Sequence, residues 1–111
     1  MHNIRYRALT AAVRGDIIGA SMPRHVYVKI TGKVHGVNFR HSAKRKAEEF
    51  GIAGYVENKS DGSIFIEAEG HREELARFLE WCKRGPSGAN VEDVDVSEGS
   101  ERGYHSFKIK D

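Results

Sequence analysis

Residues 32 to 40 read GKVHGVNFR and lie between an alternating apolar segment and a segment with a helical apolar stripe. Gly32 and Gly36 can adopt positive φ, so the backbone can turn successive amide N–H groups toward one point. A loop that leads into a helix N-terminus also presents the partial positive charge of the helix end, which suits phosphate. Arg40 adds a planar guanidinium that bonds phosphate oxygens in pairs. The stretch therefore predicts an anion-binding loop.

The spacing of the two glycines is weak evidence by itself, because Gly-x-x-x-Gly is common in ordinary turns. The stretch does not match the dinucleotide fingerprint, and a Walker loop would need Lys-Ser or Lys-Thr after its last glycine. On this pattern alone, an ordinary turn remains the alternative to a phosphate site.

Three segments together resemble the acylphosphatase family and cover residues 24–111. The loop resembles the family signature Gly-x-Val-Gln-Gly-Val-x-Phe-Arg, with His35 where glutamine is usual. GYVEN at 54–58 and the Asp-Gly pair at 61–62 resemble Gly-Trp-Val-x-Asn-x-x-Asp-Gly, with Tyr55 in place of tryptophan. A third similarity includes Gly85, Pro86, Ala89, Val91, Val94 and Val96.

The resemblance implies hydrolysis of the carboxyl-phosphate bond of acyl phosphates, giving a carboxylate and inorganic phosphate. It implies that Arg40 binds the phosphate and that Asn58 orients the attacking water. The substrate phosphate would be held by the loop residues His35, Gly36, Val37, Asn38, Phe39 and Arg40. The partner would be a small-molecule acyl phosphate, and no cofactor is expected.

Two departures from the family pattern lie near the expected site. His35 replaces an uncharged amide, so it either makes phosphate binding sensitive to pH near 6 to 7 or caps the loop. Glu57 places an acid where many relatives carry a basic residue. Because neighbouring side chains of a strand point to opposite faces, we expect only modest repulsion of substrate from Glu57.

The remaining histidines give no sign of a metal site. His2, His25, His41, His71 and His105 show no metal-ligand spacing with cysteines or carboxylates, so we expect no metal. Cys82 falls on an apolar helical stripe, and its simplest interpretation is a small core residue rather than a nucleophile.

Composition limits the class of protein. The 111 residues suffice for one domain with a core of its own. The formal charge is +2, but residues 24–111 carry 15 basic and 15 acidic residues, so the excess lies in residues 1–23. We therefore expect no nucleic-acid partner.

No apolar run approaches the roughly 18 residues that would span a membrane. A single cysteine fits a reducing compartment, and we expect a cytoplasmic monomer.

Residues 1–23, here called the leader, are poor in acids, and their short apolar run is stopped by Arg14. We expect a disordered extension, or a start codon placed too early with Met22 as the true start. An organellar transit peptide shares this composition and remains an alternative.

Periodicity predicts the elements of the body. Apolar residues alternate in 24–31 and 63–69, 52–58 and 91–96 are expected as two further strands, and Phe107 and Ile109 suggest a last short strand. Helical stripes predict one helix from Phe39 to Gly51 and another that ends at Gly85. The order strand, helix, strand, strand, helix, strand predicts an α+β, ferredoxin-like split βαβ sandwich (βαββαβ). Its antiparallel sheet would carry two helices on one face.

Two other functions remain as alternatives. RNA-binding modules of this fold stack bases on aromatic side chains, and Tyr27 and Phe65 are expected on the face away from the helices. The RNA-binding signature is missing from the third strand, however, and Glu67 and Glu69 share that face. The other alternative is a regulatory or carbamoyl-phosphate module without independent activity.

Overall fold

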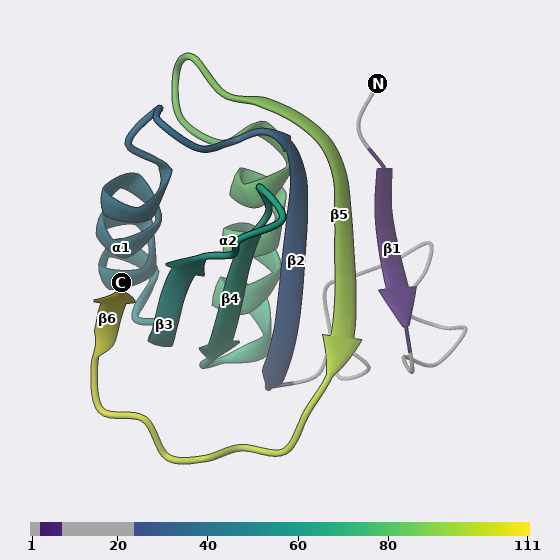
Figure 1. The fold of residues 1–111 in the computed structure, drawn as a ribbon. Helices are drawn as coiled ribbons and strands as arrows, with labels where there is room; N and C mark the ends of the chain where they lie inside the picture. Colours follow the sequence, from purple (N-terminus) through teal and green to yellow (C-terminus); the bar gives the residue numbers. More distant parts are fainter. Residues whose placement is uncertain (1–2, 8–23) are drawn as a thin grey trace.

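The computed structural model describes the backbone of residues 3–7 and all atoms of residues 24–111. The elements in chain order are β1 (Asn3–Arg7), β2 (His25–Lys33), α1 (Phe39–Phe50), β3 (Ala53–Asn58), β4 (Ile64–Glu69), α2 (Arg72–Arg84), β5 (Asn90–Glu98) and β6 (Phe107–Lys110) (Figure 1). The two predicted helices and all the predicted strands are present, with ends that differ by at most two residues.

The strands form one sheet in the order β1-β5-β2-β4-β3-β6. The four central strands are antiparallel, whereas β1 pairs with β5 and β6 pairs with β3 in parallel. The predicted ferredoxin-like arrangement with its four antiparallel strands is therefore confirmed. The strands β1 and β6 add a parallel pairing at each edge, so the complete sheet is mixed. The segment 99–106 carries the chain from the end of β5 across one end of the sheet, so β6 starts beside the beginning of β3 (Figure 1).

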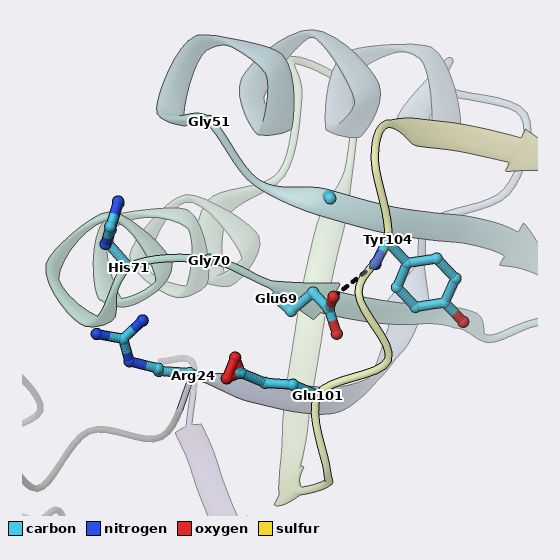
Figure 2. A pocket seen from close by; sticks show the side chains of 8 residues that line it. Arg24, Gly51, Glu69, Gly70, His71, Glu101 and Tyr104 are labelled. Atoms are coloured by element: carbon cyan, nitrogen blue, oxygen red, sulfur yellow. Dashed lines mark hydrogen bonds between the residues drawn. The ribbon is translucent and has the colours of Figure 1, made fainter.

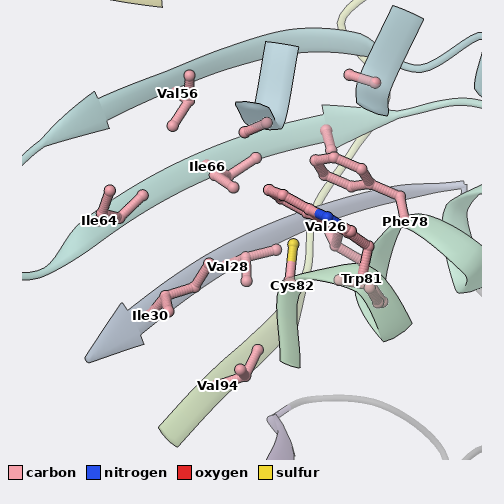
Figure 3. Close-up of a cluster of buried hydrophobic side chains, with 14 of the residues drawn as sticks. Val26, Val28, Ile30, Val56, Ile64, Ile66, Phe78, Trp81, Cys82 and Val94 are labelled. Atoms are coloured by element: carbon pink, nitrogen blue, oxygen red, sulfur yellow. The ribbon is translucent and has the colours of Figure 1, made fainter. Parts of the chain in front are cut away.

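Both helices pack on the same face of the sheet, where Val26, Val28 and Ile30 are fully buried (Figures 1 and 3). The predicted stripe of α2 is buried as expected, and it consists of Leu75, Phe78, Leu79 and Cys82. Trp81, which the sequence did not assign to this stripe, is also buried. Its ring lies 5.4 Å from the ring of Phe39 at the start of α1. This contact fixes the N-terminal end of α1 against α2.

The opposite face of the sheet is covered at one end by the segment 99–106. His25 points to this face, and only 1% of it is exposed. Its Nε2 forms a 2.6 Å hydrogen bond with Glu67, and Glu69 accepts hydrogen bonds from the backbone N–H groups of Arg102 and Tyr104. The segment 99–106 is thus attached to β2 and β4 through polar side chains.

Part of the leader departs from expectation. Asn3–Arg7 form β1, which pairs with Asp93–Ser97 of β5, so the prediction of disorder over residues 1–23 is wrong for these five residues. A five-residue extended segment can add to the exposed edge of a sheet through backbone hydrogen bonds alone, which leave little trace in the sequence. The predicted disorder of the other leader residues, and Met22, lie outside the described residues. No helix in the described part of the chain is long and apolar enough to cross a membrane.

Candidate active site

The predicted anion-binding loop begins where β2 ends. Residues 34–38 connect Lys33 to α1, and two of them have positive φ: Gly36 at 76° and Asn38 at 62°. Asn38 is the only residue other than glycine in residues 24–111 with this conformation, and asparagine adopts it more readily than most residues do. A Cβ added to Gly36 would meet no atom within 4 Å. Gly36 is therefore favoured by its backbone conformation, and the space beside it is open.

Gly32 has a different role from the one that the sequence predicted. It lies within β2, where the register against β5 shifts after Thr31. Its φ is 128°, and a Cβ would come within 2.2 Å of the carbonyl oxygen of Asn90. Gly32 therefore forms a bulge against the neighbouring strand, and the loop itself is shorter than the expected residues 32–40.

The N-terminus of α1 faces the loop without a side-chain cap. Asn38 is the N-cap residue, but its side chain makes no capping hydrogen bond. The first helical bond runs from the N–H of Ser42 to the carbonyl of Asn38. The N–H groups of the first helical turn have no partner within a helix, so they are suited to an anion.

The side chains of Val37 and Phe39 belong to the core rather than to the open side of the loop. Val37 packs against the hydrophobic core, and Phe39 is 2% exposed. Of the residues predicted to hold phosphate, these two can contribute only their backbone N–H groups.

Arg40 lies in the first turn of α1, and its guanidinium reaches the end of β6. Its Nη1 donates to the carbonyl oxygen of Lys110 at 3.4 Å and to Oδ1 of Asp111 at 3.1 Å. Both contacts use the same nitrogen of a group with five N–H donors. The arginine can therefore keep these contacts and still bond two oxygens of a phosphate.

Asn58 is the last residue of β3, and its side-chain Oδ1 is buried without a hydrogen-bond partner among the described residues. A buried hydrogen-bond acceptor without a partner is uncommon in folded proteins. The side-chain oxygen of Asn58 is therefore available to accept a hydrogen bond from a bound molecule. Glu57, which precedes it, pairs across the sheet with Lys110 of β6. Arg40 and Asn58 therefore lie at the same end of the sheet.

A tight hairpin follows Asn58. The backbone N–H of Lys59 donates to the carbonyl oxygen of Ser63 at 2.9 Å, and Asp61 accepts from the backbone N–H and the hydroxyl of Ser63. These hydrogen bonds, with the ammonium of Lys29, hold the pKa of the Asp61 carboxyl well below its usual range. The turn is therefore fixed by a carboxylate that stays ionised.

His35 is joined to this hairpin. Its Nε2 donates to the carbonyl oxygen of Ser63 at 2.8 Å, so the expected phosphate ligand has one ring nitrogen engaged elsewhere. The sequence did not indicate Ser63, because a backbone carbonyl is chemically the same in every residue. The same reason explains why the contact of Arg40 with Lys110 was missed.

Two other side chains that the sequence singled out have clear partners or surroundings. Glu57 forms an ion pair with Lys59 at 3.1 Å, so its charge has an opposite charge beside it. Burial raises the pKa of the Cys82 thiol well above its usual range, which agrees with a core residue. In residues 3–7 and 24–111, no three His, Cys, Asp or Glu side chains are grouped to hold a metal.

A pocket of about 230 Å³ opens at the other end of the sheet (Figure 2). It is lined by Arg24, Gly51, Ala53, Glu69, Gly70, His71, Glu101 and Tyr104. These residues lie around the starts of β2 and β3, the end of β4, the end of α1, the start of α2 and the segment 99–106. The loop and Asn58 lie at the opposite ends of β2 and β3. This pocket is separate from the predicted site.

Comparison with known proteins identifies the family of this chain. The family model described as Acylphosphatase matches residues 26–109. An acylphosphatase of Nocardioides sp. is 44% identical over 85 residues, which cover 77% of this chain and 86% of the relative. The acylphosphatase of Thermus thermophilus is also 44% identical, over 79% of this chain and 99% of the relative.

A solved structure extends the agreement to three dimensions. The crystal structure of acylphosphatase from Bacillus subtilis matches with a TM-score of 0.77 and 35% identity, covering 78% of this chain and 98% of that one. The residues matched by the family model, 26–109, include the loop, the start of α1 and the end of β3. The chain therefore belongs to the acylphosphatase family.

Proposed function

We propose that this chain hydrolyses acyl phosphates to a carboxylate and inorganic phosphate. The loop 34–38 and Arg40 hold the phosphate, and Asn58 orients the attacking water. The observation that carries this proposal is the placement of Arg40 and the unpaired Oδ1 of Asn58 at the same end of the sheet, beside an uncapped helix N-terminus.

The chemistry requires little more than these groups. The oxygen of water bonds to phosphorus while the bond from phosphorus to the carboxyl oxygen breaks, and the leaving group is a carboxylate. A carboxylate departs without the help of a strong acid. Positioning of the reactants and stabilisation of charge on the phosphoryl oxygens can therefore supply the catalysis, as in phosphoryl transfer generally.

Arg40 is expected to dominate phosphate affinity. A hydrogen bond to a charged partner contributes about 1.5–3 kcal/mol, whereas a helix end contributes about 0.3–1 kcal/mol. The loop and the end of α1 provide the geometry of the site. The guanidinium provides a full charge that remains at any working pH.

Asn58 is assigned to the water rather than to proton transfer. A neutral amide is not a general base, but its oxygen accepts a hydrogen bond from water and its NH₂ group donates to another oxygen. The proton lost by the water passes to the phosphate or to solvent. This assignment uses the side-chain oxygen that the described protein groups leave unpaired.

The direct test is release of inorganic phosphate from acetyl phosphate by the purified chain, with and without EDTA. We expect turnover well above spontaneous hydrolysis, and the same rate after chelation, since the described residues contain no group of three His, Cys, Asp or Glu side chains that could hold a metal. Loss of activity on chelation and its return with magnesium would contradict the metal-free mechanism. Absence of turnover under both conditions would favour the module without independent activity.

A further inference from the structure

We propose that His35 is a positioning residue that joins the phosphate-binding loop to the hairpin carrying Asn58. This inference rests on the proposed function, since it concerns how the phosphate and the attacking water are held at a fixed separation. It assigns to His35 a role different from direct binding of phosphate.

One carbonyl oxygen makes the connection. The oxygen of Ser63 accepts a hydrogen bond from the backbone N–H of Lys59 at 2.9 Å and from Nε2 of His35 at 2.8 Å. Lys59 directly follows Asn58 in the chain. The imidazole is therefore bonded to the same atom that closes the turn beside the water-orienting residue, from 28 positions away in sequence.

The acceptor end of this connection is rigid. Ser63 is 2% exposed, and its N–H and hydroxyl both donate to Oδ1 of Asp61, at 2.9 and 2.6 Å. The next residue, Ile64, begins β4 and is fully buried. A group bonded to the carbonyl of Ser63 is thus held relative to the sheet, which carries Asn58.

The chemistry of the contact also determines which ring nitrogen of His35 carries a hydrogen. A carbonyl oxygen only accepts, so Nε2 must carry the hydrogen. The neutral tautomer with hydrogen on Nε2 and the imidazolium both meet this condition, so the connection persists in either charge state. While Nε2 donates to Ser63, it does not donate to a phosphate oxygen.

The distance that His35 controls matters for the reaction. Reacting atoms must approach to about 3–3.5 Å, and an error of 1 Å can cost about 100-fold in rate. The phosphate depends on the loop amides and Arg40, whereas the water depends on Asn58. Without the imidazole of His35, the hydrogen bond that joins the phosphate-binding loop to the hairpin carrying Asn58 is lost. Turnover should therefore fall more than the affinity for phosphate.

The test compares His35→Ala, His35→Gln and His105→Ala. His105 is an exposed histidine in the segment 99–106, so its variant controls for loss of a histidine. His35→Ala should lower kcat about tenfold and change the inhibition constant for inorganic phosphate less than about threefold. His35→Gln should recover most of the turnover, since its side-chain NH₂ has a similar reach and can donate to Ser63. His105→Ala should behave as the unmodified chain does.

A second substitution links the effect to Asn58. If His35 acts by placing Asn58, then His35→Ala should cost little further turnover in a chain that already carries Asn58→Ala. Full additivity of the two losses would overturn the inference. So would a loss of phosphate inhibition in His35→Ala equal to its loss of turnover, since that result marks a phosphate ligand.

The hydrogen bond between His35 and Ser63 can also be tested without measuring enzyme activity. Such a test can fail independently of the proposed function. Amide hydrogen exchange at Lys59, followed by NMR, should be at least about tenfold faster in His35→Ala and unchanged in His35→Gln. Unchanged exchange in both variants would refute the connection, whatever the enzyme does. If the unmodified chain releases no phosphate while exchange responds as expected, only the proposed function fails.

His35→Asn, whose side chain is too short to reach Ser63, replaces His35→Ala if the alanine variant does not fold.

Discussion

At the scale of single residues, the site depends on backbone conformations that few residue types adopt. Gly36 and Asn38 both have positive φ in the loop before α1, and the left-handed conformation costs an ordinary residue about 1–2 kcal/mol. Such conformations persist where the surrounding structure enforces them, often at binding sites. Here they turn the chain into the helix so that its uncapped N-terminus faces the loop.

Arg40 and Asn58 are expected to give different kinetic signatures. Arg40 contacts the phosphate in the ground and transition states, so Arg40→Ala should weaken inhibition by inorganic phosphate and lower turnover about 100- to 1000-fold. Asn58 matters once water attacks, so Asn58→Ala should lower kcat severely and leave phosphate inhibition nearly unchanged. The measurement is the phosphate inhibition constant of each variant beside its turnover number. Equal loss of phosphate binding in both variants would make Asn58 a phosphate ligand.

At the scale of elements, the segment 99–106 is held to the sheet by a buried ionisable cluster. Glu67 accepts from the hydroxyl of Tyr104 at 3.0 Å and lies 2.9 Å from Nε of Arg102, in addition to its bond with His25. Burial, the hydrogen bond to Glu67 and the charge of that carboxylate raise the pKa of Tyr104 to about 12. The cluster thus joins β2, β4 and the segment that leads to β6.

This cluster predicts a dependence of stability on pH. Burial alone would raise the pKa of Glu67, but hydrogen bonds from His25 and Tyr104 and the charges of His25 and Arg102 outweigh burial, so the pKa of Glu67 lies below its ordinary value. A carboxyl whose folded-state pKa is depressed stabilises the fold above its unfolded pKa, and this stability is lost as pH falls through the folded value. We expect the free energy of unfolding to decrease as pH falls below about 4.5.

Glu67→Gln should reduce this dependence. We expect it to lower the free energy of unfolding by about 1–3 kcal/mol at pH 7, because charge-assisted hydrogen bonds are lost in a buried place. The loss should shrink at low pH, where Glu67 itself becomes neutral. Urea denaturation between pH 3 and pH 7 measures both effects, with Glu80→Gln on the exposed side of α2 as the control. An equal loss at every pH would show that the charge of Glu67 does not contribute.

At the scale of the whole molecule, the family domain and the leader meet only at an edge of the sheet in the described structure. β1 pairs with β5 and is four places from β3 in the sheet. The phosphate loop, Arg40 and Asn58 all come from residues 24–111. We therefore propose that the leader is dispensable for activity and contributes modestly to stability.

Removal of the leader tests this division. A chain that begins at Met22 should keep its turnover of acetyl phosphate within about twofold. Its melting temperature should fall by about 4–8 °C if β1 contributes about 1 kcal/mol. A chain that begins at Asn3 retains β1 and is the matched control for removal of residues alone. An unchanged melting temperature would show that β1 does not stabilise the sheet, and lost activity would show that the leader acts on the site.

Sequence alone determined the elements and the chemical character of the site, since both depend on neighbours along the chain. The alternation of Val26, Val28 and Ile30 shows which face of β2 is buried in the core. The apolar stripe that begins at Phe39 likewise shows the buried face of α1. The loop motif indicated which residues to examine. These patterns involve residues that are close in sequence, so they can be recognised without knowledge of the fold.

Tertiary structure alone decided which distant groups meet. The bulge at Gly32 exists because β5 lies against it, and β6 is parallel because the segment 99–106 crosses the end of the sheet. His35 reaches Ser63 across 28 positions, and Arg40 reaches Asp111 across 71. Several of these contacts end on backbone atoms, which are the same in every residue. The sequence therefore carries no mark of them, and only the packed chain brings them together.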